Sequence, residues 1–201
     1  MAGDPVIEAI RAGLPVLLPT DTVYGLATSA ESEAAVLGLY RLKGRAATQP
    51  TALVAGSIEA LLGAVPELDE RARAIVRTLL PGPFTLVLPN PARRFRLLAG
   101  TRPEAIGVRV PELPGVARPV FEAVGCVLAT SANEPGEPAP ARLEDVPARI
   151  REACAAELDA GPLPGTPSTV IDFTGPEPFV IREGAVSSAD AIDRVRAALA
   201  A

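Results

Sequence analysis

The chain has 201 residues, of which 48% are hydrophobic, 21% charged and 3% aromatic, a composition typical of a globular protein with an aliphatic core. Its formal net charge of −5 argues against binding of nucleic acid by bulk electrostatics. Histidine is absent, which excludes Ser-His-Asp and Cys-His catalysis and argues against a transition-metal site, so we expect no metal bound by the protein itself.

Localisation follows from the apolar runs and the cysteines. No apolar run approaches the roughly 20 residues that span a bilayer, and the N-terminus lacks the basic and apolar regions of a signal peptide. The flanks of Cys126 and Cys154 predict a strand and a helix, so we interpret both cysteines as small apolar residues in a reducing compartment. We expect a cytoplasmic protein that does not contact a membrane.

The N-terminal half alternates helices and strands. Asp4 and Pro5 predict the start of a short helix that ends at Gly13, and a buried strand follows over 15–20. The stretch "LPTDTVYGLA" then ends this strand in a polar turn. The spacing of apolar residues and the capping residues predict further helices at 31–44, after Ser57 and at 68–80, with strands at 51–56 and 84–89.

The C-terminal half adds strands, some of them close together in the chain. The pattern predicts strands at 105–111, 126–130, 168–173 and 178–183, and helices at 115–125, 143–161 and 189–200. This mixture predicts an α/β fold with one twisted, mixed sheet, and 201 residues require only a single domain. Proline-rich residues 134–141 are expected to form an exposed ordered loop or a lid.

Several strands run into polar or cationic residues that an apolar core does not require. Arg109 and Arg182 stand among valines and isoleucines, and "KGR" at residues 43–45 ends a helix. Ligands of α/β sheets favour the crevice beyond strand ends, so these cations could bind phosphate or carboxylate there. The hydroxyls of Thr22, Ser131 and Ser168 could orient a small polar substrate.

Each of these signals also has an ordinary structural interpretation. An arginine that alternates with valines usually lies on the solvent face of a strand. "TDT" after a strand is often a turn bonded to its own backbone, and "KGR" is a common helix C-terminus. Considered singly, none of the signals establishes a site.

Seven motifs in order nevertheless carry a resemblance to one family. They are "LPTDTVYGLA", "RLKGR", "PGPFTLVLP", "GVRVPELP", "ATSANEPGEPAP", "PSTVIDFTG" and "VIREGAV". Together they span about residues 15–186 and resemble the YrdC/Sua5 (TsaC) family of threonylcarbamoyl-AMP synthases in its short, single-domain form.

The resemblance implies an enzyme that joins L-threonine, bicarbonate and ATP into L-threonylcarbamoyladenylate and releases pyrophosphate. Mg²⁺ would arrive on the phosphates of ATP. The product would serve the proteins of the threonylcarbamoyl transferase complex, which modify position 37 of tRNA. The family fold implies a YrdC-like domain with a large, concave, cationic cavity, and phosphoryl transfer of this kind needs neither a histidine nor a protein nucleophile.

The resemblance also implies roles for individual residues. Thr22 and Ser168 would bind the threonine substrate, with Arg109 on its carboxylate. The ATP site would comprise Lys43, Arg45, Ser131, Asn133 and Arg182, and the catalytic cations would be Lys43, Arg45 and Arg109. Asp21 either fixes the turn or takes part in the site, whereas Tyr24 and Gly25 would shape the backbone.

Four positions depart from the pattern of the family. Pro135 and Ala139 replace hydroxyl residues, Gln49 stands where a cation or asparagine is common, and Val54 stands where some relatives place a histidine. Each change removes a polar group, which favours an alternative: a YrdC/YciO-type paralogue that binds nucleotide, double-stranded RNA or tRNA with little synthase activity. A carbamoyl-adenylate module of hydrogenase maturation is a weaker third hypothesis, because such modules normally sit in longer chains with zinc-binding cysteines.

Overall fold

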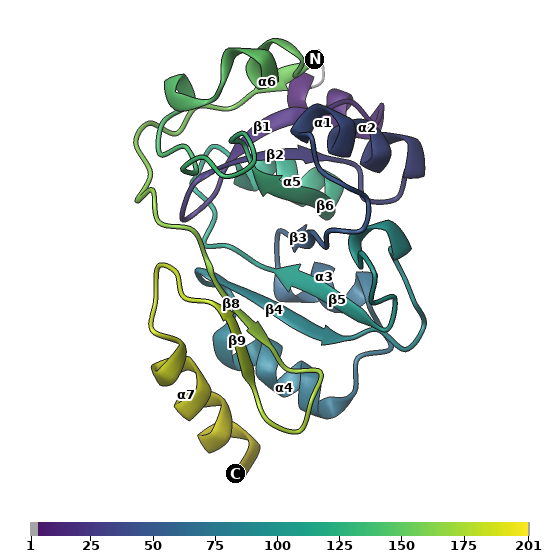
Figure 1. Cartoon of the computed structure of the whole chain (residues 1–201), viewed down its shortest axis with the longest axis vertical. Helices are drawn as coiled ribbons and strands as arrows, with labels where there is room; N and C mark the ends of the chain where they lie inside the picture. The colour runs from purple at the N-terminus through teal and green to yellow at the C-terminus, as the bar shows by residue number, and fades with distance from the viewer. Residues whose placement is uncertain (1–3, 201) are drawn as a thin grey trace.

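A computed structural model describes residues 4–200, with the chain folded around one nine-stranded mixed sheet (Figure 1). The strands follow the order β7-β1-β2-β6-β3-β5-β4-β8-β9. They are β1 (Val16–Pro19), β2 (Tyr24–Thr28), β3 (Ala52–Ala55), β4 (Phe84–Pro89), β5 (Ala105–Arg109), β6 (Cys126–Ser131), β7 (Ala156–Glu157), β8 (Thr169–Asp172) and β9 (Phe179–Arg182). The predicted α/β class with a twisted mixed sheet is confirmed.

The helices begin and end largely where the capping signals predict. They are α1 (Pro5–Arg11), α2 (Glu33–Lys43), α3 (Ile58–Ala64), α4 (Glu70–Leu79), α5 (Arg118–Val124), α6 (Ala148–Glu152) and α7 (Ser188–Ala200), with 3₁₀ turns η1 (Arg96–Leu98) and η2 (Leu143–Asp145). Asp4 caps α1, Ser57 caps α3, and Gly44 ends α2 in the left-handed conformation.

Two predictions of local structure are wrong. The stretch "YGLAT" is strand β2, which pairs antiparallel with β1 from Pro19↔Tyr24 to Val16↔Ala27, so the bend lies at residues 20–23. The helix predicted over 143–161 is only α6, because Pro147 lacks the N–H that a continuous helix requires at that position. Residues Ala156–Glu157 form the short strand β7 beside β1 instead.

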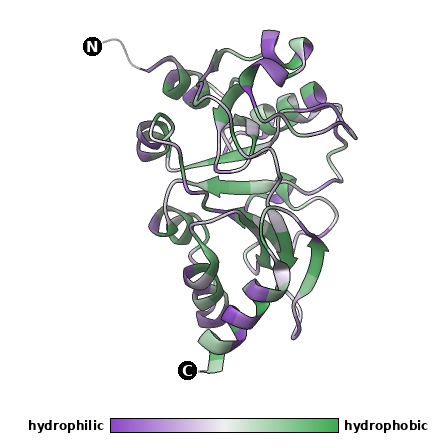
Figure 2. Cartoon of the chain, turned by 90° about the vertical axis from the view of Figure 1, so that its left-hand side faces the viewer, coloured by the Kyte–Doolittle hydropathy of each residue, from purple (hydrophilic) through white to green (hydrophobic). Residues whose placement is uncertain are grey.

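Alternate residues of the strands enter two hydrophobic clusters. Leu17 belongs to the larger cluster, which includes residues of α2, α3, α4 and α7, whereas Val16 and Leu18 belong to the cluster that includes α1 and α5. Figure 2 shows the strands as mostly hydrophobic and the outer sides of the helices as hydrophilic. Burial of both clusters fixes the register of the central strands, because a slip by one residue would exchange the two sets.

No helix among residues 4–200 is long and apolar enough to cross a membrane.

Candidate functional site

A cavity of about 700 Å³ lies over the middle of the sheet. Its floor consists of small residues from adjacent strands: Gly107 of β5 pairs with Ala52 of β3, and Ala52 pairs with Ala129 of β6. Small side chains in register leave the space above them open, and a Cβ at Gly107 would come within 3.1 Å of Thr51 O. The hollow is therefore built into the sequence of the strands.

Most of the residues predicted for the site line this one cavity. These are Arg45, Arg109, Ser131, Asn133, Ser168 and Arg182. Thr22 and Lys43 are absent from its walls, although each bonds to a residue that lines it. Residues from opposite ends of the chain are thus brought together over strands β3, β5, β6, β8 and β9.

Arg109 is the most deeply buried cation of the cavity. Its Nη2 donates to Asp21 Oδ1 and to Thr22 Oγ1, the latter at 2.7 Å, and the side chains of Arg109 and Asp21 are each 10% exposed. Burial lowers the pKa of the Arg109 guanidinium, and the charge of Asp21 opposes this shift. Its Nε is buried without a hydrogen-bond partner.

Thr22 lies behind Arg109, where it is fully buried. Thr20 Oγ1 donates to Val23 O at 2.8 Å, accepts from the backbone N–H groups of Thr22 and Val23, and lies 3.1 Å from Thr22 Oγ1. Thr22 Oγ1 in turn accepts from Arg109 Nη2, so the turn helps to orient Arg109.

Arg182 and Ser168 form the adjacent wall of the cavity. Ser168 Oγ lies 2.8 Å from Thr85 Oγ1, and Arg182 Nη2 donates to Ser168 O at 2.9 Å. Burial and the neighbouring positive charge of Arg109 both lower the pKa of Arg182. Two guanidinium groups that line one cavity and repel one another favour the binding of an anion there.

The "KGR" and "TSAN" motifs meet at the third wall. Lys43 Nζ is buried and donates to Ser131 O at 2.7 Å, to Asn133 Oδ1 at 2.6 Å and to Asn133 O. Burial lowers the pKa of Lys43 to about 8, with a further contribution from the charge of Arg45. Arg45 donates to Pro50 O, while its Nε is buried without a partner. Lys43 thus supports the loop at Ser131–Asn133, and Arg45 faces the cavity.

Arg102 is a cation of the cavity that the sequence did not reveal. Its Nη1 donates to Asp172 Oδ2 and its Nη2 to Thr174 Oγ1, at 2.8 and 2.9 Å. It lies in the loop "GTRPEA" before β5, where no strand or helix pattern marks it. Four arginines and a single carboxylate residue, Glu137, line the cavity among the described residues.

The four departures from the family pattern fall in two groups. Val54 and Ala139 line the cavity and make its wall more apolar, whereas Gln49 and Pro135 are exposed residues outside the lining. Only the first two therefore change the surface that a ligand would meet.

The two cysteines lie outside the cavity and do not pair with each other. Burial raises the pKa of Cys126 to about 11 and that of Cys154 to about 12. Both thiols are protonated at neutral pH and are poor nucleophiles. No group of three or more His, Cys, Asp or Glu side chains within residues 4–200 is arranged to hold a metal ion.

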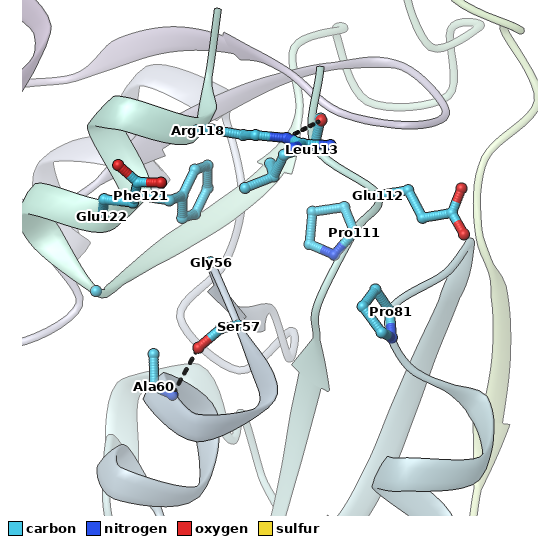
Figure 3. A pocket seen from close by; sticks show the side chains of 11 residues that line it. Gly56, Ser57, Ala60, Pro81, Pro111, Glu112, Leu113, Arg118, Phe121 and Glu122 are labelled. Atoms are coloured by element: carbon cyan, nitrogen blue, oxygen red, sulfur yellow. Dashed lines mark hydrogen bonds between the residues drawn. The ribbon is translucent and has the colours of Figure 1, made fainter. Parts of the chain in front are cut away.

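A second, smaller cavity of about 510 Å³ lies beyond the ends of β3 and β5, beside α3 and α5. Figure 3 shows Glu112 and Glu122 at opposite ends of it, with Arg118 bonded back to Leu113 O at 3.3 Å. Its charged groups do not converge on a common point. The segment Pro111–Leu113 forms one wall, and the N–H of Glu112 donates to Asp21 Oδ2 at 3.0 Å.

Known proteins are similar to this chain in both sequence and fold. The Sua5/YciO/YrdC family model, described as "Telomere recombination", matches residues 8–184. The chain belongs to this family, as its seven motifs predicted.

Curated relatives of similar length support this assignment. A protein of Mycobacterium tuberculosis is 35% identical over 184 residues, which cover 90% of this chain and 83% of the relative. The threonylcarbamoyl-AMP synthase of Chromohalobacter salexigens is 34% identical over 173 residues, which cover 85% of this chain and 92% of the relative.

Solved structures share the fold. Pyrococcus abyssi Sua5, solved in complex with L-threonine, superposes with a TM-score of 0.83 at 33% identity; the match covers 94% of this chain and 55% of Sua5. Escherichia coli YciO superposes with a TM-score of 0.81 at 26% identity, covering 92% of this chain and 90% of YciO. The chain therefore spans about half the length of the Sua5 structure and most of YciO.

Proposed function

We propose that this chain is a threonylcarbamoyl-AMP synthase, which condenses L-threonine, bicarbonate and ATP into L-threonylcarbamoyladenylate and pyrophosphate. One observation carries the proposal. Arg45 Nε and Arg109 Nε are the two buried side-chain N–H groups of the described residues that lack a partner, and both belong to residues that line the cavity. An unpaired buried donor costs about 1–3 kcal/mol. Each Nε is shielded from solvent, so an anion would reach it only after the side chain shifts, and binding would then offset this cost.

The two arginines suit the two anions of the reaction. Arg109, held among Asp21, Thr22 and Arg182, would receive the single carboxylate of threonine, with the Ser168 hydroxyl available to the threonine side chain. P. abyssi Sua5, which shares this fold, was solved with L-threonine bound.

The opposite wall suits the phosphates of ATP. Arg45, Arg102 and Arg182 of the cavity lining would supply charge to them, and Ser131 and Asn133 would supply polar groups. Lys43 would act on the nucleotide through the backbone of residues 131–133, because its three hydrogen bonds already commit the ammonium group. Mg²⁺ would enter on the phosphates of ATP and supply charge neutralisation.

The chemistry requires positioning and cationic stabilisation. Bicarbonate supplies CO₂ and leaves hydroxide; the threonine amine adds to the carbon of CO₂, and the proton that it loses combines with the hydroxide as water, which leaves a carbamate. A carbamate oxygen then attacks the α-phosphorus while the bond to the β-phosphate oxygen breaks, and pyrophosphate leaves. Negative charge develops on the phosphoryl oxygens and the leaving group, where arginines that need no reorganisation are most effective.

The test measures pyrophosphate release from Mg·ATP. We expect release to require both L-threonine and bicarbonate and to fall by at least about 100-fold in Arg109→Ala, because an arginine–carboxylate contact and its orientation are lost together. An exposed arginine outside the cavity provides the matched control: Arg77→Ala should retain full activity. Release without threonine dependence would refute the proposal.

The paralogue with little synthase activity is the second candidate, favoured by the apolar Val54 and Ala139 in the cavity wall and by the likeness to E. coli YciO. It predicts nucleotide, double-stranded RNA or tRNA binding without threonine-dependent release of pyrophosphate. Under the first proposal, the adenylate passes to threonylcarbamoyl transferase proteins in the cytoplasm, where ATP and tRNA are available.

A further inference from the structure

The turn at residues 20–23 holds a carboxylate between the backbone of one strand end and the main arginine of the cavity. Asp21 Oδ1 pairs with Arg109 Nη2, and Asp21 Oδ2 accepts the Glu112 N–H at 3.0 Å. The carboxylate is therefore fixed at both oxygens. It connects the turn after β1 with the segment after β5, which are far apart in sequence.

The pair leaves one part of the guanidinium free. Nη2 carries two hydrogens, and Asp21 and Thr22 accept both of them. The remaining donors of Arg109 are on Nε and Nη1, and Nε is buried without a partner. The residues of the turn thus hold the guanidinium by Nη2 and leave Nη1 for a ligand, whereas Nε is shielded from solvent.

The surrounding charges show why such an anchor is needed. Arg182 faces Arg109 closely enough to lower its own pKa, so the two guanidinium groups repel each other in the absence of an anion. The three charges of Arg109, Arg182 and Asp21 sum to +1, which matches one carboxylate. With Asp21 removed, the sum is +2, and the hydrogen bond from Nη2 to Thr22 Oγ1 is left to oppose movement of Arg109 away from Arg182 without the ion pair.

We propose that Asp21 is a positioning residue that holds Arg109 for recognition of the substrate carboxylate. This inference rests on the proposed function and deepens it. The direction of the change in L-threonine affinity tests it, because a carboxylate beside an arginine can either compete with the substrate carboxylate or position the arginine for it. A competitor for the arginine weakens carboxylate binding, so its removal strengthens binding. A positioning residue has the opposite effect.

Calorimetric titration of the full chain with L-threonine, without ATP, distinguishes the two roles. We expect the dissociation constant for L-threonine to rise roughly tenfold or more in Asp21→Asn, which keeps the shape of the side chain and removes its charge. The preference for L-threonine over L-threoninamide, which lacks the carboxylate, should shrink in the same variant. Asp21→Glu, which restores the charge, should recover part of that preference.

Two controls separate positioning from folding. Glu67→Gln breaks another carboxylate–arginine pair, Glu67 with Arg94, on the surface, and should leave threonine binding unchanged. Steady-state kinetics should show a higher KM for threonine in Asp21→Asn with the KM for ATP within twofold of the wild type. If Asp21→Asn unfolds, Asp21→Glu provides the test. Its carboxylate is displaced by one methylene, so its preference for L-threonine over L-threoninamide should be smaller than that of the wild type.

The outcomes are distinguishable. Unchanged or tighter binding of L-threonine by a folded Asp21→Asn protein would overturn the inference and leave the proposed function intact. Failure of the wild-type chain to bind L-threonine would overturn the proposed function and this inference with it. Weaker binding with equal loss for L-threonine and L-threoninamide would assign Asp21 a merely structural role.

Discussion

Replacement of Lys43 by methionine removes an ammonium group that supports the loop at Ser131–Asn133. The group is buried and donates to Ser131 O, Asn133 O and Asn133 Oδ1, two of these contacts measuring 2.7 and 2.6 Å. Methionine keeps most of the aliphatic volume of lysine. The substitution therefore tests the hydrogen bonds and the charge rather than packing.

The size of the effect follows from the acceptors left behind. Each buried acceptor without a partner costs about 1–3 kcal/mol. Ser131 Oγ still donates to Asn133 Oδ1 at 2.6 Å, so this acceptor keeps one bond and the two carbonyls lose theirs. Burial of the ammonium charge is itself unfavourable and lowers the pKa of Lys43 to about 8. Methionine carries no charge, so the substitution removes this unfavourable contribution. We expect a net loss of about 2–4 kcal/mol, or a fall in Tm of roughly 4–16 °C for a chain of this size.

Differential scanning calorimetry and ATP kinetics check this prediction. The KM for ATP should rise about tenfold, since Ser131 and Asn133 lose the group that holds their loop. Arg41→Met on the same helix is the matched control: Arg41 is exposed, so its stability should change by less than about 0.5 kcal/mol. If Lys43→Met has the same Tm as Arg41→Met and keeps the wild-type KM for ATP, Lys43 does not support this loop.

Two further predictions concern charge. Because the pKa of Lys43 in the folded protein is about 8, below its ordinary 10.5, the unfolded chain binds the proton more tightly, and Lys43 raises the free energy of unfolding as pH increases from about 8 to 10.5. Urea denaturation at pH 7 and pH 9.5 should show this gain in the wild type relative to Lys43→Met; an equal response would contradict it. Arg102→Gln should raise the KM for ATP about threefold to tenfold while threonine binding stays unchanged, because Arg102 lines the cavity and is proposed to contact the phosphates. A change confined to threonine would place the phosphates elsewhere.

The fold was predictable where local signals agreed with the tertiary structure. The caps at Asp4, Ser57 and Gly44 lie where the sequence placed them. Strand β2 was missed because "YGLAT" is short and contains a glycine, which a propensity argument assigns to a turn. The segment becomes a strand because it pairs with β1 on one side and β6 on the other, and a local propensity does not reveal this pairing.

The sequence indicated many residues of the candidate site but not how their side chains are arranged. Strand pattern marked Arg109 and Arg182 because an arginine among apolar residues is unusual, whereas Arg102 stands in a polar loop where an arginine is ordinary. The sequence also gave no means to distinguish residues of the cavity wall from those behind it. Thr22 and Lys43 belong to the second group: Thr22 accepts a hydrogen bond from Arg109, and Lys43 donates to the loop at residues 131–133.

The proposed reaction joins threonine, bicarbonate and ATP in the cavity, and labelled bicarbonate tests it most directly. The full chain is incubated with ¹³C-bicarbonate, L-threonine and Mg·ATP, and the products are resolved by mass spectrometry while pyrophosphate is measured in the same reaction. We expect threonylcarbamoyladenylate that carries the ¹³C label, in an amount equal to the pyrophosphate released. Pyrophosphate without a labelled adenylate, or no threonine-dependent pyrophosphate at all, would contradict it.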